Sequence, residues 1–305
     1  MKINLGAFVA HWRTQAGLGV EELASGIMDG SNLRRFENGQ SLPSKENLEA
    51  IFGRLGINPN SLANIFLDEG TVATERVKAE LDSCLINGLT EKANELITQL
   101  ENNNKFAKNK FNMQHLLAAK AANAVNMGEP PEAVLKILDM AINSTWKKFD
   151  EKRVCEYLLT NADLKIISMR AMSLFELGER GRGIDLLYAL KENIEKNTID
   201  NEEKGRRLPQ IIYHLAMYLG QLATNRVDYK TVSELCDRGR KVCIETSYYL
   251  FLPSILMVKA DARYQLGDKD GCRKLLIQSS NIFEAFEMYD DIGTIKTTPR
   301  AIALT

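Results

Sequence analysis

Histidine is scarce in this 305-residue chain, and the common sequence motifs of enzymes are absent. His11, His115 and His214 do not form the HExxH spacing that binds zinc on a helix. The chain also lacks the phosphate-binding loop GxxxxGK[ST], the dinucleotide fingerprint GxGxxG and the nucleophile motif GxSxG. We therefore expect no enzyme, no cofactor and no metal site.

Paired cysteines and long apolar runs are also missing. The five cysteines are an odd number with no CxxC spacing, and most fall in apolar helical patterns, which predicts reduced packing residues. No window of about 18 apolar residues occurs, and the first residues lack the apolar core of a leader peptide. We expect a cytoplasmic protein with no membrane span. The cysteines are Cys84, Cys155, Cys236, Cys243 and Cys272.

An excess of basic residues is absent as well. The net charge is −1, and residues 1–68 hold six basic and seven acidic side chains. Such a chain has no general attraction for polyanions, because counterion release depends on lysine and arginine placed against phosphates. Any nucleic-acid binding must come from a local cluster and from dimeric geometry.

The chain does contain a pattern that occurs three times. A small residue is followed seven positions later by a glycine and an acid, and then by another small residue five positions after the glycine. Small residues let two helices approach closely and glycine turns the chain, so the pattern predicts stacked helical hairpins. The three copies are Ala121, Gly128-Glu129, Ala133; Ala171, Gly178-Glu179, Gly183; and Ala260, Gly267-Asp268, Cys272.

The first 68 residues have a different organisation and predict five short helices. The apolar spacing of a helix starts after Asn4 and stops at Gly17, and further helices are expected at 20–27 and 30–37. A fourth helix follows Ser44 and a fifth follows residues 59–61. In the third helix, Leu33 and Phe36 are expected to point inward, which leaves the polar and basic residues between them outside.

The second and third helices resemble a helix-turn-helix DNA reader. The phrases Arg13-Thr-Gln-Ala-Gly-Leu18, Glu22-Leu-Ala24 and Leu33-Arg-Arg-Phe-Glu-Asn-Gly39 resemble the five-helix repressor-type domain called Xre. Within that superfamily, SGIMDGSNLRRFENGQS is most similar to the Rgg-like branch. The resemblance implies an Xre-type helix-turn-helix DNA-binding domain over residues 1–68.

The resemblance implies that the helix from Asp29 to Phe36 lies in the major groove. Arginine can make a bidentate contact to guanine and asparagine to adenine. An ion pair between Arg13 and Glu37 is implied as a structural link. Two departures from the family are Val20, where a polar residue is usual, and Gly30, which offers no side chain to a base. The implied DNA-binding residues are Gly30, Ser31, Asn32, Arg34, Arg35 and Asn38.

Residues 69–305 are predicted to form about five tetratricopeptide-like helix pairs, an α-solenoid for peptide binding and dimerisation. Glycine turns are expected at 88, 128, 178 and 267, and the first helix of each pair is expected to line a concave surface. Polar side chains and methionine there suit the main chain of an extended peptide. The candidate peptide-binding residues are Asn126, Lys165, Ser168, Met172, Met257, Asp261 and Gln265.

The full-length order, an Xre-type domain followed by helical repeats, resembles the RRNPP group of bacterial peptide-pheromone receptors. This implies a homodimeric transcriptional regulator of quorum sensing, which binds a short signalling peptide and a double-stranded DNA operator. Two alternatives remain open. In the first, the chain is a protein–protein interaction module whose helix-turn-helix reads no DNA; in the second, it is an Xre-type repressor that needs no ligand.

Overall fold

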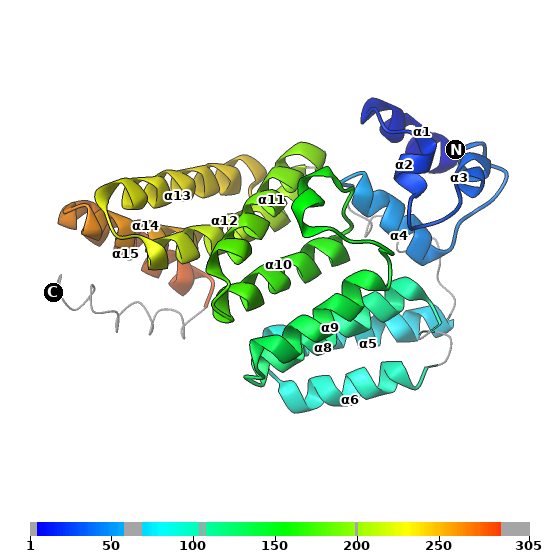
Figure 1. The fold of residues 1–305 in the computed structure, drawn as a ribbon, viewed down its shortest axis with the longest axis horizontal. Helices are drawn as coiled ribbons and strands as arrows, with labels where there is room; N and C mark the ends of the chain where they lie inside the picture. The colour runs from blue at the N-terminus through cyan, green and yellow to red at the C-terminus, as the bar shows by residue number, and fades with distance from the viewer. Residues whose placement is uncertain (1–4, 58–68, 104–105, 107, 199–200, 288–305) are drawn as a thin grey trace. The chain divides into compact units, whose positions relative to one another are not determined.

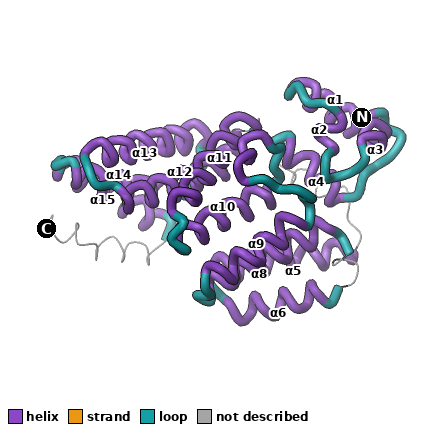
Figure 2. Tube along the Cα trace, viewed as in Figure 1, coloured by secondary structure: helices purple, strands orange, loops and turns teal. Residues whose placement is uncertain are grey.

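The computed structural model describes the chain except for residues 1–4, 58–68, 104–105, 107, 199–200 and 288–305. Every element in the described residues is helical (Figure 2), which confirms the expected all-α class. The chain divides into two compact units, residues 1–193 with 197–199, and residues 194–196 with 200–305. The predicted domain boundary at residue 68 lies outside the described residues and stays a prediction.

The chain starts with four short helices, α1 (Leu5–Gln15), α2 (Val20–Ala24), α3 (Gly30–Glu37) and α4 (Lys45–Arg54) (Figure 1). They confirm four of the predicted helices, and the fifth lies outside the described residues. Helix α2 ends at Ala24 rather than at residue 27, because Gly26 takes a positive φ of 72° that a continuing helix does not allow. A shared core holds the helices together, and it includes Val9, Leu23, Leu33, Phe36, Leu48 and Phe52.

The same compact unit continues with helical hairpins. Its helices are α5 (Glu69–Ile86), α6 (Thr90–Glu101), α8 (Lys110–Asn126), α9 (Pro131–Asn143), α10 (Asn161–Glu176) and α11 (Arg180–Asn197). Gly88, Gly128 and Gly178 have φ values of 66°, 74° and 96°, which confirms the predicted glycine turns. The short 3-10 helix η2 (Glu151–Glu156) precedes α10, so the segment from 151 to 177 is two elements divided near Asn161.

The second compact unit repeats the hairpin design with α12 (Asn201–Leu222), α13 (Arg226–Thr246), α14 (Leu252–Gln265) and α15 (Lys269–Ala285). Gly267 turns the chain between α14 and α15 with a φ of 89°. Proline is usual in the first turn of a helix, but Pro209 lies inside α12, which starts eight residues earlier at Asn201. No helix in the described parts of the chain has both the length and the apolar character to cross a membrane.

The small residues of the repeat pattern lie where paired helices approach each other. A side-chain carbon added at Gly183 of α11 would lie 2.6 Å from the main-chain oxygen of Ala171 in α10. Ala171, Ala260 and Cys272 are fully buried. This close approach confirms the physical reason for the small residues, since a larger side chain would force the two backbones apart.

Candidate nucleic-acid interface

Helix α3 has a well-defined start and a clear division between its inner and outer faces. Asp29 caps it by accepting a 2.8 Å hydrogen bond from the main-chain nitrogen of Ser31. Hydrogen bonds from the Ser31 side chain and main chain also hold the pKa of Asp29 below its usual value. Leu33 and Phe36 are buried in the helical core. The helix is therefore fixed by its inner face, and its outer face is left for contacts with another molecule.

The outer face carries most of the predicted DNA-binding side chains. Ser31, Asn32, Arg34 and Arg35 are all exposed, and they occupy one short helix of eight residues. Gly30, in contrast, is buried at the start of the helix. The structure thus brings together the four side chains that the resemblance implies for base and phosphate contacts. Their role stays a prediction.

Asn38, the remaining predicted DNA contact, closes the helix. Its main-chain N–H donates back to the Arg34 oxygen at 3.0 Å, and Gly39 follows with a φ of 72°. The Asn38 side chain is exposed. Asn38 therefore lies at the C-terminal end of the same surface.

Arg13 and Glu37 form the ion pair that the resemblance implies. Arg13 Nε and Nη2 donate to the two Glu37 carboxylate oxygens at 2.6 and 2.8 Å, and Nη1 donates to the Leu18 oxygen at 2.9 Å. The Glu37 hydrogen bond raises the pKa of Arg13. A bidentate pair with side chains 16% and 8% exposed is protected from solvent, so it links α1 to the end of α3.

One of the two arginines on the outer face of α3 lies beside a carboxylate. Arg34 Nη2 lies 3.3 Å from Glu21 Oε1 of α2, and both side chains are more than half exposed. Arg35 extends from the next position, also into solvent. The surface therefore presents a local pair of guanidinium groups, the kind of cluster that a chain without overall positive charge needs for nucleic-acid binding.

Arg54, at the end of α4, makes contacts that its neighbours in the sequence do not predict. Its side chain is 5% exposed. Nη1 donates to the oxygens of Leu23, at 3.0 Å, and Ser25, and the guanidinium lies 5.0 Å from the centre of the Trp146 ring. Burial lowers the pKa of Arg54 to about 10, against the opposing attraction of Asp163. No local pattern marks this residue, because Trp146 and Asp163 are about a hundred residues away in sequence.

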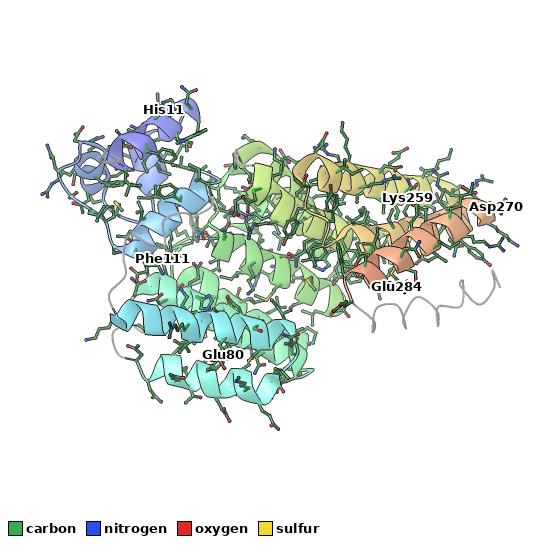
Figure 3. All side chains as sticks on the ribbon, turned by 180° about the vertical axis from the view of Figure 1, so that it is seen from behind. His11, Glu80, Phe111, Lys259, Asp270 and Glu284 are labelled. Atoms are coloured by element: carbon green, nitrogen blue, oxygen red, sulfur yellow. The ribbon has the colours of Figure 1, made fainter. Side chains whose placement is uncertain are left out.

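Lys110 makes a second contact between the N-terminal helices and the repeats. It donates from the start of α8 to the main-chain oxygens of Gly26 and, at 3.2 Å, Ile27. Burial lowers the pKa of Lys110. The neighbouring residue Phe111, labelled in Figure 3, packs against the N-terminal core. The turn between α2 and α3 is therefore held from one side by the repeats.

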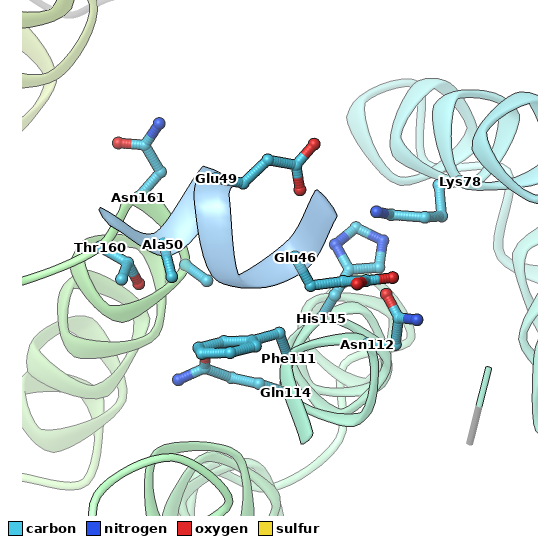
Figure 4. A pocket seen from close by; sticks show the side chains of 11 residues that line it. Glu46, Glu49, Ala50, Lys78, Phe111, Asn112, Gln114, His115, Thr160 and Asn161 are labelled. Carbon is cyan, nitrogen blue, oxygen red and sulfur yellow. The ribbon is translucent and has the colours of Figure 1, made fainter. Parts of the chain in front are cut away.

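A cavity of about 160 Å³ lies along this contact (Figure 4). Its lining combines Glu46 and Glu49 of α4 with Lys78, His115 and Gln114 of the repeats. Gln114 Nε2 donates to Asp163 Oδ1 at 2.7 Å and to Thr145 Oγ1 at 2.8 Å. The cavity is smaller than the ~300–1,000 Å³ typical of ligand pockets, so we interpret it as incomplete packing at the contact.

The predicted peptide-binding residues fall in both compact units. In the first, Asn126 Nδ2 donates to the Leu85 oxygen at 2.8 Å, and Lys165 Nζ lies 3.7 Å from Asp82 Oδ1. Ser168 is buried and Met172 is half-buried. The first two contacts both reach α5, so side chains of the first helices of three hairpins meet on one surface. In the second unit, Met257 and Asp261 are half-buried on α14 and Gln265 is exposed.

A larger cavity in the repeats has different walls. It measures about 420 Å³ and is lined by residues of α6, α8 and α9, including Ile97, Asn123 and Ile137. Its walls combine the first helix α8 with the second helices α6 and α9, so the cavity is not lined by first helices alone. Its position could not be predicted from the sequence, since Asn123 and Ile97 fit an ordinary packing pattern.

The described residues contain no group of three or more His, Cys, Asp or Glu side chains that could hold a metal ion. Burial raises the pKa of Cys236 to about 12 and that of Cys243 to about 11, so neither thiol forms the reactive thiolate at neutral pH.

Comparisons with known proteins identify the fold. No family model matches the sequence, and no curated protein matches it. PlcR of Bacillus thuringiensis, solved in complex with the peptide PapR7 and DNA, is 17% identical with a TM-score of 0.60, covering 97% of this chain and 99% of PlcR. ComR of S. thermophilus, solved with DNA and its signalling peptide ComS, is 15% identical with a TM-score of 0.51, covering 96% and 97%. The likeness over both full lengths confirms the expected architecture.

Proposed function

We propose that this chain is a DNA-binding transcriptional regulator whose helical repeats bind a short signalling peptide. The observation that carries the proposal is the outer face of α3, where Ser31, Asn32, Arg34 and Arg35 project together from a rigid helix. These side chains suit base edges and phosphates in a major groove. The shared fold supports the proposal, because the solved PlcR and ComR structures contain both DNA and a peptide.

The rigidity of α3 matters for reading DNA. The Asp29 cap fixes its start, and the Arg13–Glu37 pair fixes its end against α1. A side chain held on an anchored helix loses less conformational entropy when it binds a base. Two such helices in a homodimer would meet half-sites about one helical turn, ~34 Å, apart.

The contacts of Arg54 and Lys110 provide the physical link between the repeats and the DNA-binding helices. A peptide changes DNA binding only through a different affinity for two arrangements of the protein. A cytoplasmic homodimer that exchanges between two spacings of its α3 helices would couple the two ligands in this way. The predicted residues Asn126, Lys165, Ser168 and Met172, together with Met257, Asp261 and Gln265, are proposed for the peptide.

The proposal is tested by footprinting the purified protein on the DNA upstream of its own coding region at about 0.15 M salt. A protected site on that DNA, and none on a shuffled duplex of the same composition, is the expected result. Calorimetric titration with short synthetic apolar peptides encoded near the gene tests the second ligand. Sequence-specific protection with no heat from any peptide would favour a repressor that needs no ligand. Absence of protection both with and without peptides would favour an interaction module.

A further inference from the structure

An acidic side chain of α2 lies against the start of α3. Glu21 projects from the first turn of α2, and a side-chain carbon built on Gly30 would overlap both of its carboxylate oxygens. The carboxylate therefore occupies the place that a side chain at position 30 would fill. Gly30 does not have a positive φ, so the backbone does not require glycine there. The role of Gly30 is therefore to leave space for the Glu21 carboxylate.

The same carboxylate contacts a predicted DNA-reading residue. Glu21 Oε1 lies 3.3 Å from Arg34 Nη2, one helical turn along α3 from Gly30. Its sequence neighbour Glu22 has a different partner, because Glu22 Oε2 accepts a 3.2 Å hydrogen bond from the main-chain nitrogen of Gly19. Two adjacent acids on one helix thus differ in role, and one of them faces the DNA-reading surface.

A guanidinium has more donors than one base contact uses. Arginine offers five N–H groups in a rigid fork, and a bidentate contact to guanine O6 and N7 uses two of them. Each Nη nitrogen carries two hydrogens, so with Glu21 beside Nη2 the Arg34 guanidinium retains one parallel pair of donors for a neutral base edge, either Nε with Nη2 or Nη1 with Nη2. A phosphate is different, because it carries negative charge and would approach the Glu21 carboxylate as well as the guanidinium.

We propose that Glu21 is a positioning residue for specificity: it orients Arg34 toward a guanine edge and repels phosphates from the start of α3. Gly30 is part of this arrangement, because only a residue without a side chain leaves room for the Glu21 carboxylate. This inference rests on the proposed DNA-binding function. It states that the acid strengthens the preference for the operator by weakening binding to other sequences.

Three single substitutions separate this role from a general effect of charge. Glu21→Gln keeps the size of the side chain and removes the charge beside Arg34. Gly30→Ala keeps every charge and displaces Glu21 from its place. Glu22→Gln removes the same charge from the same helix without touching Arg34, and it is the matched control.

The measurement is the affinity of each full-length protein for the footprinted upstream duplex and for a shuffled duplex, from about 0.05 to 0.2 M salt. If Arg34 becomes free to contact one more phosphate, the plot of log affinity for shuffled DNA against log salt concentration should become steeper by about 0.9. Binding to shuffled DNA at the lowest salt should then rise roughly threefold or more in both Glu21→Gln and Gly30→Ala, while binding to the upstream site does not rise in proportion. Urea unfolding of each variant checks that the fold is retained.

The outcomes distinguish this inference from the proposed function. If the wild-type protein does not prefer its upstream DNA, the proposed function fails. If it does, and Glu21→Gln and Glu22→Gln change the two affinities equally, charge alone explains the effect and the positioning role of Glu21 is wrong. If Glu21→Gln lowers the preference but Gly30→Ala does not, the role assigned to Gly30 is wrong.

Discussion

Two faces of the N-terminal helices carry arginines in opposite surroundings. The Arg34 side chain on the outer face of α3 is 59% exposed and lies beside one carboxylate. Arg54 at the end of α4 is 5% exposed, donates to two main-chain oxygens and packs on Trp146. The comparison shows that burial, rather than residue type, decides what an arginine does. The Arg34 guanidinium remains available to a ligand, whereas the donors and the face of the Arg54 guanidinium contact other parts of the protein.

The largest expected effect lies on the outer face. The double substitution Arg34→Ala, Arg35→Ala removes the proposed base contact of Arg34, which contributes about 1–3 kcal/mol to discrimination, and the proposed phosphate contact of Arg35. Affinity for the upstream site should therefore fall by two orders of magnitude or more, measured by fluorescence anisotropy on a labelled duplex. Arg240→Ala, an exposed arginine on α13, serves as the control and should bind like the wild type. Equal binding by the double variant and the control would remove α3 from the interface.

The next effect concerns stability. Arg54→Ala leaves the buried oxygen of Leu23 and the part-buried oxygen of Ser25 without this donor, and it removes the packing on Trp146. The free energy of unfolding should drop by about 3 kcal/mol, the range seen when a buried charged hydrogen bond is broken. Urea unfolding followed by circular dichroism and tryptophan fluorescence measures it. The exposed variant Arg35→Ala should change stability by less than about 0.5 kcal/mol. Similar urea midpoints for Arg54→Ala and Arg35→Ala would show that the two arginines do not differ in their contribution to stability.

A smaller effect on stability is expected from alanine at two glycines, and it separates the cost of backbone strain from the cost of a contact with the repeats. Gly17 and Gly26 have nearly equal positive φ values, 69° and 72°. A side-chain carbon at Gly17 would meet open space, whereas at Gly26 it would lie 3.2 Å from the Thr145 oxygen. Both Gly→Ala changes should cost about 1 kcal/mol for the left-handed backbone, and Gly26→Ala should cost about 1 kcal/mol more. Equal losses in urea unfolding would show that the contact with Thr145 contributes nothing.

The smallest effect is in the salt dependence of DNA binding. Arg35→Ala should reduce the slope of log affinity against log salt by about 1, because one phosphate contact is lost. Arg54→Met should leave the slope unchanged, since a buried guanidinium releases no counterion when DNA binds. Anisotropy titrations at four salt concentrations give both slopes. A reduced slope for Arg54→Met would mean that the buried arginine reaches the DNA.

The outer face could be predicted from sequence because its pattern is local. Leu33 and Phe36 are three positions apart, and Asp29 caps the helix that contains them, so eight consecutive residues define both faces of α3. The glycine turns are equally local, since glycine tolerates the positive φ that a turn between two helices needs at Gly128 or Gly178.

The inner contacts could not be predicted in the same way. Arg54 meets Trp146, and Lys110 meets Gly26, across sequence separations that no periodic pattern encodes. Pro209 shows a related difficulty, because a proline usually marks the first turn of a helix but here lies inside α12. The expected helix at 20–27 puts Glu21 in its first turn, where the structure has it, yet the position of Glu21 over Gly30 depends on how two helices pack.

The central claim, that the outer face of α3 reads DNA from the major groove, is tested most directly by methylation protection at guanine N7. The account predicts protected guanines in two half-sites, separated by a whole number of helical turns of ~34 Å, and loss of a protected guanine from each half-site in Arg34→Ala. A footprint without protected N7 atoms, or the same protected guanines in Arg34→Ala, would contradict it.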